Sequence, residues 1–272
     1  MSDINVMSKC DAEKAMKATR LPGVKHKLVV MSGKGGVGKS TVAVNLAMAL
    51  VKQGKTVGVL DADLHGPSVP KMLGCPDAQL SVVGQRILPA EPAPRLRVVS
   101  VAYLASERDA PVVWRGPVKM GAIRQFIEDV EWGNLDYLIV DLPPGTGDEP
   151  LSVAQLVPSP DGAIIVTTPQ DVALISVRKS IRFARMLDLK VIGLVDNMNG
   201  YMCPKCGEPA DIFGGDLALK AAEEYEVPYL GKVPLHPAVA HSGEDGVPFV
   251  MSGGPAAEAF EAIVSKIVAA VE

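Results

Sequence analysis

Aromatic residues and cysteines are scarce in this chain of 272 residues, and what is missing excludes several classes of protein. Phe, Trp and Tyr make up 4% of the sequence, so Val, Ala, Ile and Leu must build the core, as in proteins with parallel sheets. Four cysteines are too few for a disulfide scaffold and fit a reducing compartment. No apolar run approaches the length of a membrane span, and residues 1–27 lack the apolar core of a secretory signal. We therefore expect a cytoplasmic protein.

Positive charge is also in short supply. The chain has 27 Lys and Arg against 31 Asp and Glu, a formal net charge of −4, and no strongly basic stretch. A nucleic-acid surface is usually marked by such a stretch. The predicted final helix, over residues 256–271, carries Glu258 and Glu261 against the single lysine Lys266, unlike a basic helix that lies on a membrane. We expect no nucleic-acid partner and no membrane.

The hydrophobic pattern predicts one α/β domain, with short apolar strands that alternate with amphipathic helices. We expect residues 1–24 to form a loosely ordered lead-in and residues 25–272 to form a single doubly wound, mostly parallel sheet flanked by helices. Residues 74–95, rich in Pro and Gly, predict an exposed loop or small hairpin. Strands are predicted over residues 27–31, 56–60, 96–104, 137–141, 162–168, 190–198 and 229–233, and further helices over 40–51, 114–130 and 172–187.

The clearest motif is a glycine-rich loop between the first predicted strand and the helix that follows it. Residues 33–40 read G-K-G-G-V-G-K-S, a full match to G-x-x-x-x-G-K-S/T in strand–loop–helix context. Glycines let successive N–H groups face phosphate oxygens, and the new helix adds its positive end. The loop therefore predicts an ATP site, with Lys39 on the β- and γ-phosphates and Ser40 on Mg²⁺. The predicted nucleotide-binding residues here are Gly33, Lys34, Gly35, Gly36, Val37, Gly38, Lys39, Ser40 and Thr41.

Polar residues at the ends of other predicted strands complete this site. Asp141 ends an apolar strand as a Walker B carboxylate does, which predicts a second magnesium-side ligand. Asp63 follows the strand over residues 56–60, and we predict that it positions the attacking water and also lies near Mg²⁺. Gly145, in the P-P-G-T-G loop after Asp141, is predicted to sense the γ-phosphate through its N–H. Asn197, at the end of the sixth strand, has an amide suited to an adenine edge.

A second site is predicted in the C-P-K-C-G segment at Cys203 and Cys206. This pattern presents two sulfurs on one side of a tight turn, which favours a metal over a thioredoxin-like redox pair because Gly207-Glu208-Pro209 is a poor helix start. Zinc and iron–sulfur sites both want four thiolates, and this spacing alone does not distinguish them. The economical route to four is a homodimer in which each subunit supplies one pair. Cys10 and Cys75 stand alone and are assigned no role.

Taken together, the motifs resemble those of the Mrp-type P-loop ATPases, the iron–sulfur cluster carriers of the deviant Walker A group that includes MinD and ParA. The resemblance covers residues from about Lys25 to the C-terminus. It depends on S-G-K-G-G-V-G-K-S-T, L-D-A-D-L-H-G-P-S-V-P-K-M-L-G, I-V-D-L-P-P-G-T-G-D and D-N-M-N-G-Y-M-C-P-K-C-G.

This resemblance implies a homodimer that binds ATP in each subunit, hydrolyses it slowly and passes a labile 4Fe–4S cluster on Cys203 and Cys206 to apo iron–sulfur proteins. In the family, the lysine at the position of Lys34 reaches the partner's nucleotide. We therefore predict Lys34, Lys39 and Asp63 as the catalytic residues. The alternative is a MinD- or ParA-like positioning or partitioning ATPase in which the cysteine pair holds a structural zinc.

Overall fold

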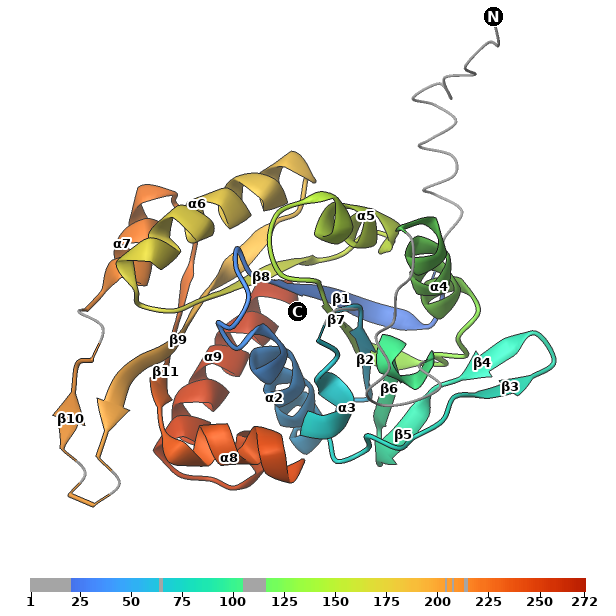
Figure 1. The fold of residues 1–272 in the computed structure, drawn as a ribbon, viewed down its shortest axis with the longest axis horizontal. Helices are drawn as coiled ribbons and strands as arrows, with labels where there is room; N and C mark the ends of the chain where they lie inside the picture. The colour runs from blue at the N-terminus through green and yellow to red at the C-terminus, as the bar shows by residue number, and fades with distance from the viewer. Residues whose placement is uncertain (1–20, 64–65, 105–115, 204, 207, 213–214) are drawn as a thin grey trace, which may run out of the picture.

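The computed structural model describes residues 21–63, 66–104, 116–203, 205–206, 208–212 and 215–272. Within them, a central sheet of nine strands is covered by helices on both faces (Figure 1). The prediction of a doubly wound, mostly parallel sheet is confirmed. The strands of the chain are β1 (Val24–Met31), β2 (Val57–Asp61), β3 (Ser81–Val83), β4 (Arg86–Leu88), β5 (Ala90–Ala93), β6 (Leu96–Ser100), β7 (Leu135–Asp141), β8 (Gly162–Thr167), β9 (Val191–Met202), β10 (Pro209–Ala210) and β11 (Tyr229–Leu235).

The strand order places the phosphate loop at the centre of the sheet. The order is β10-β9-β8-β1-β7-β2-β6-β5, with β11 paired to the free side of β9. All main-sheet pairs are parallel except those of the edge strands β5 and β10. Every residue of β2 and β8 is buried, because strands covered on both faces have no solvent-facing side. The loop after β1 therefore lies between the carboxyl ends of β7 and β8.

Helices pack on both faces of the sheet and form two cores. On one face, α2 (Lys39–Lys52) and α9 (Pro255–Val271) pack with α3 (Val69–Met72), α8 (Pro237–Asp245) and the 3₁₀ turn η2 (Phe249–Met251). On the other face lie α4 (Gly116–Glu128), α5 (Asp148–Leu156), α6 (Asp171–Met186) and α7 (Leu217–Glu224), as Figure 1 shows. Most of α2 is buried because the sheet, α3 and α9 surround it. None of the described helices is both long enough and apolar enough to cross a membrane.

Two strand predictions require correction. The strand predicted over residues 96–104 ends at Ser100 and continues as the 3₁₀ turn η1 (Val101–Leu104). The reason is that the Ser100 hydroxyl accepts a hydrogen bond from the N–H of Ala102 and donates one to Asp61, which turns the chain. The sixth strand, predicted to end at residue 198, continues as β9 to Met202 because its last residues pair with the short strand β10.

Other segments were only partly predicted or were missed. The region 74–95 contains the predicted hairpin, β3–β4, but β5 joins the main sheet. Helices α3, α5, α7 and α8 were not predicted. Of the predicted lead-in, residues 1–20 lie outside the described residues, whereas Leu21 and Val24 are buried in the core. The domain boundary at residue 25 stays a prediction.

Candidate phosphate-binding and thiolate sites

The parallel register brings the predicted site residue Asp141 and the neighbouring Asp61 to one edge of the sheet. Val30 of β1 is paired with Asp141 of β7, and Asp141 is paired with Asp61 of β2. Helix α2 begins at Lys39, directly after the glycine loop that follows β1. This arrangement follows from parallel pairing, because strands that run in the same direction end at the same edge. Residues more than 100 positions apart in the chain therefore lie within hydrogen-bonding distance.

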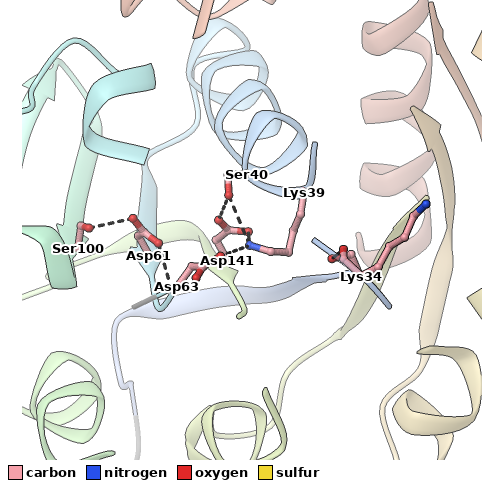
Figure 2. Close-up of polar contacts among 8 residues, drawn as sticks. Lys34, Lys39, Ser40, Asp61, Asp63, Ser100 and Asp141 are labelled. Atoms are coloured by element: carbon pink, nitrogen blue, oxygen red, sulfur yellow. Dashed lines mark hydrogen bonds and ion pairs between the residues drawn. The ribbon is translucent and has the colours of Figure 1, made fainter. Parts of the chain in front are cut away.

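Lys39, Ser40 and Asp141 form a closed network at this edge (Figure 2). The Lys39 ammonium lies 2.7 Å from Asp141 Oδ1 and 3.7 Å from Asp63 Oδ2, and the Ser40 hydroxyl donates to Asp141 Oδ2 at 2.6 Å. Asp141 is fully buried. Burial raises the pKa of Asp141, and the Lys39 ammonium acts in the opposite direction by favouring the carboxylate. The buried lysine and the two carboxylates thus compensate one another.

Asp61 is fixed by its own hydrogen bonds. The Ser100 hydroxyl donates to Asp61 Oδ2 at 2.8 Å, and the N–H of Asp63 donates to Oδ1 at 3.2 Å. Burial, and then the neighbouring Asp141, raise the pKa of Asp61 to about 7. Asp61 therefore shapes the turn that carries Asp63, whose side chain faces Lys39. Sequence reasoning missed Ser100, which lies inside the strand predicted over residues 96–104; the end of β6 at Ser100 and its pairing with Asp61 of β2 come from the structure.

The residues of the glycine loop have very different surroundings. The backbone of Gly33 packs so closely on α6 that a Cβ atom would lie 2.3 Å from the Ser176 carbonyl oxygen. Gly35 and Gly36 face open space, whereas Val37 is buried in the core. Thr41 lies in the first turn of α2, where its carbonyl accepts from Asn45. Gly33 is thus fixed by packing, and Gly35 and Gly36 have room on their outer side.

Lys34 and Gly145 make contacts other than those predicted with nucleotide. The Lys34 side chain is partly buried and points away from Lys39 (Figure 2), and its ammonium donates to Gln170 Oε1 at 3.1 Å. The N–H of Gly145 donates to the Ser32 carbonyl at 2.9 Å, so this bond must open before the group can contact a phosphate. Their roles toward nucleotide stay predictions.

Asn197 binds the phosphate loop directly. Its amide nitrogen donates to the Val37 carbonyl at 2.8 Å, and the side chain is buried. The next loop residue, Gly38, has a left-handed φ of 82°, and a Cβ atom there would lie 2.1 Å from the Asn197 amide nitrogen. Asn197 therefore supports the loop, a role that sequence reasoning missed. Its predicted contact with adenine stays a prediction.

We expect Gly38→Ala to lower the free energy of unfolding by about 2–3 kcal/mol, because it adds left-handed strain and disrupts a buried hydrogen bond. Gly35→Ala is the matched control in the same loop, since its Cβ atom would meet nothing within 4 Å. Urea unfolding without nucleotide measures both variants. Equal stability of the two would contradict the close approach of Asn197.

A cavity of about 370 Å³ opens beside the loop, next to Thr41, Asn197 and Met198. Its other walls come from α3, α8 and the end of β11, including Leu235 and His236. The ion pair between Lys71 and Glu244 joins α3 to α8 along this cavity. Its volume falls within the range of small-molecule pockets, and it adjoins the phosphate loop. None of the α8 side chains was predicted to take part.

The two predicted cysteines lie on a hairpin that extends from β9. Tyr201 and Met202 pair with Ala210 and Pro209 of β10, and the N–H of Cys203 donates to the Glu208 carbonyl at 3.1 Å. Both thiols are free, and Cys206 is exposed. The backbone N–H groups of Cys206 and Lys205 face the Cys203 sulfur and lower the pKa of its thiol. This favours the thiolate, the form that binds metals.

The donor sets fit the two predicted inorganic ligands to different degrees. Ser40 and Asp141 offer a hydroxyl and a carboxylate at one point beside Lys39, the oxygen donors that Mg²⁺ prefers. Asp63 Oδ2 lies 3.7 Å from the same ammonium. At the hairpin, Cys203 and Cys206 supply two sulfurs, and no group of three or more His, Cys, Asp or Glu suited to a metal occurs in the described part of the chain.

Comparison with known proteins identifies relatives of the chain. The chain is 50% identical over 249 residues to an iron-sulfur cluster carrier protein of Methanocaldococcus jannaschii, which covers 92% of this chain and 86% of the relative. It is 47% identical over 255 residues to a cytosolic Fe-S cluster assembly factor NUBP2 homolog of Nematostella vectensis, with 91% and 94% covered.

Among solved structures, a nucleotide-binding protein from Archaeoglobus fulgidus in complex with ADP matches with a TM-score of 0.77 and 37% identity over 90% of this chain and 94% of that chain. The cell division ATPase MinD of Pyrococcus furiosus matches with a TM-score of 0.64 at 22% identity, over 90% and 98% respectively, and shows the fold alone. The predicted P-loop NTPase fold and the predicted family resemblance are confirmed. The model of the ParA family described as NUBPL iron-transfer P-loop NTPase matches residues 23–268, and the chain belongs to that family.

Proposed function

We propose that this protein is an ATP-binding, slowly hydrolysing carrier that holds a labile 4Fe–4S cluster as cargo between two copies of the chain and passes it to apo iron–sulfur proteins. One observation carries the proposal: the strand whose Asn197 supports the phosphate loop continues directly into the hairpin of Cys203 and Cys206. A nucleotide site and a thiolate site on one strand suit a carrier whose affinity for its cluster depends on nucleotide. The names of the relatives, iron-sulfur cluster carrier and assembly factor, support the same cargo.

At the nucleotide site, each of the residues around Lys39 has a separate role. Lys39 exchanges the Asp141 carboxylate for the β- and γ-phosphates, which is an exchange of one anionic partner for another. Ser40 and Asp141 would hold Mg²⁺, which would neutralise charge on the phosphates. Asp63, already beside Lys39, orients the water. The cavity next to Thr41 and Asn197 takes the nucleoside.

On the cargo side, the proposal requires a homodimer. A cubane cluster held by cysteines takes four thiolates, and one hairpin supplies two of them. Two hairpins that meet across a twofold axis supply all four. The partly buried Lys34 donates a solvent-exposed hydrogen bond to Gln170, and exchanging such a bond for a partner's phosphates costs little. The name of one relative, a cytosolic Fe-S cluster assembly factor, supports a cytoplasmic location.

Anaerobic reconstitution followed by transfer tests the proposal. The protein is treated with iron and sulfide, desalted, and mixed with the apo form of a 4Fe–4S dehydratase in the presence of an iron chelator. We expect broad absorption near 400 nm, about four irons per dimer, and chelator-resistant activation of the dehydratase. Colourless protein with about one zinc per dimer would instead favour the positioning ATPase with a structural zinc clamp.

A further inference from the structure

Strand β9 contains a left-handed kink between the phosphate loop and the thiolate hairpin. Met198 has a φ of 60°, and Gly200, two residues later, has a φ of 80°. A long side chain with positive φ is uncommon and must be held by its surroundings. The residue before the kink is Asn197, which binds the Val37 carbonyl. The kink therefore lies where β9 leaves the nucleotide site.

One side-chain hydrogen bond spans this kink. The amide of Asn199 donates to Asp196 Oδ2 at 2.5 Å, and both side chains are buried. In a regular strand, residues three apart point to opposite faces, so these side chains could not meet without a turn of the backbone between them. The left-handed Met198 provides that turn. The Asp196–Asn199 bond therefore depends on the kink.

Asp196 depends strongly on this bond. Tyr229 lies within 3.5 Å of the same oxygen, a long contact, and Oδ1 has no hydrogen-bond partner among the residues that the structure describes. Burial raises the pKa of Asp196 to about 6, and the Asn199 hydrogen bond is the largest contribution that lowers it. A buried carboxylate with so few donors is costly unless the donor it has stays in place.

The kink also lies on the wall of the nucleotide-side cavity. Met198 lines the cavity with Asn197 and Thr41, so a ligand there contacts the kinked residue itself. On the other side, Gly200 leads within three residues to Cys203. No other described connection between the two sites is as short along the chain.

We propose that the Asp196–Asn199 hydrogen bond is a positioning lock that holds the kink at Met198, and that nucleotide in the adjoining cavity changes the exposure of Cys203 and Cys206 through this kink. The proposal rests on the proposed function for the identity of the cargo, but its own claim concerns only nucleotide and thiols. Asp196 and Asn199 act through the hairpin and touch neither ligand.

The test measures thiol reactivity of the metal-free, reduced full chain in a Cys10→Ser/Cys75→Ser background. The probe is a disulfide reagent, with the rate followed in the absence of nucleotide and with Mg²⁺ and a non-hydrolysable ATP analogue. In this background, with no substitution in β9, we expect nucleotide to change the rate of thiol reaction about fivefold or more. In Asn199→Ala this ratio falls to about one, while affinity for a fluorescent ATP analogue stays within about twofold, because coupling and binding are separate free energies.

Two further variants separate a lock from a general loss of structure. The exchange Asp196→Asn/Asn199→Asp keeps one donor and one acceptor and restores the nucleotide-dependent ratio. Tyr229→Phe removes only the long contact and leaves the ratio unchanged. If Asn199→Ala does not fold, Asn199→Ser, which removes the amide donor and keeps a small polar side chain, takes its place.

The proposal would be overturned if the ratio of thiol reaction rates with and without nucleotide were the same in all variants. It would also be overturned if nucleotide had no effect on this rate in the protein with no substitution in β9. Since no iron is used, the result is independent of the cargo. If the protein fails to bind iron but its thiol reaction rate still depends on nucleotide and on Asn199, the proposed cargo is wrong and the proposed role of the Asp196–Asn199 bond still holds.

Discussion

Replacing both hairpin cysteines, Cys203→Ala/Cys206→Ala, is expected to abolish iron binding and the absorption near 400 nm after reconstitution, because no thiolate remains to hold a cluster. Nucleotide affinity should not change, since the hairpin lies beyond the end of the phosphate site. Iron content, sulfide content and the visible spectrum measure the first effect, and titration with a fluorescent ATP analogue measures the second.

The matched control for this prediction is Cys75→Ala. The Cys75 thiol lies 3.2 Å from the Tyr103 hydroxyl, and burial raises its pKa, which disfavours the thiolate that metals require. Cys75→Ala should keep the full iron content. The single variants Cys203→Ala and Cys206→Ala should each lose most of the iron, because a dimer then offers two sulfurs. Retention of about four irons per dimer by the double variant would place the cluster elsewhere.

Lys39→Ala is expected to lower ATP hydrolysis by about 100-fold or more, the usual effect of losing one positioned donor for developing phosphate charge. The loss should extend to binding, because Asp63 and Asp141 then face the triphosphate without a cation between them. Phosphate release measures hydrolysis, and a fluorescent ATP analogue measures affinity. Lys34→Ala is the matched control, because the Lys34 side chain points away from Lys39 and donates to Gln170. This variant should keep nucleotide affinity and lose only hydrolysis that needs the partner.

Lys39→Ala is also expected to lower the free energy of unfolding. Asp141 is fully buried and 2.7 Å from Lys39, so Lys39→Ala leaves a buried carboxylate without its cation, at about 3 kcal/mol. Lys39→Ala/Asp141→Asn should recover most of that stability and none of the ATP binding. This pair of results separates binding from folding. Recovery of binding in the double variant would show that Lys39 has no contact with phosphate.

The glycine loop could be predicted from the sequence because its chemistry is contiguous. Residues 33–40 carry the turn, the backbone donors and Lys39 within one local segment, and the helix after them follows from a buried apolar pattern. Asp141 was predicted for a similar reason, as the last residue of an apolar strand. The pairing of Asp141 with Asp61, however, comes from the parallel register of β7 and β2.

Contacts that support the site were not predictable in this way. The Asn197 amide donates to the Val37 carbonyl from 160 positions away. The N–H of Gly145, which follows β7, donates to the carbonyl of Ser32, which follows β1. Neither contact leaves a local pattern, since each depends on the strand order, in which β7 lies beside β1 and β9 lies one strand further away, beyond β8. The sequence also predicted an end to the sixth strand at residue 198, because the residues that follow look like a loop until β10 pairs with them.

By itself, the sequence determined the fold class, the phosphate loop, the Walker B carboxylate and the thiolate pair. Each of these depends on residues that are neighbours along the chain or repeat with the period of a strand or helix. The tertiary structure decided how they work together: Lys39 held between Asp63 and Asp141, Asn197 on the loop, and the kink at Met198 under the Asp196–Asn199 bond. The physical reason is that buried polar groups must find partners in space, and strand order and register set which partners are near.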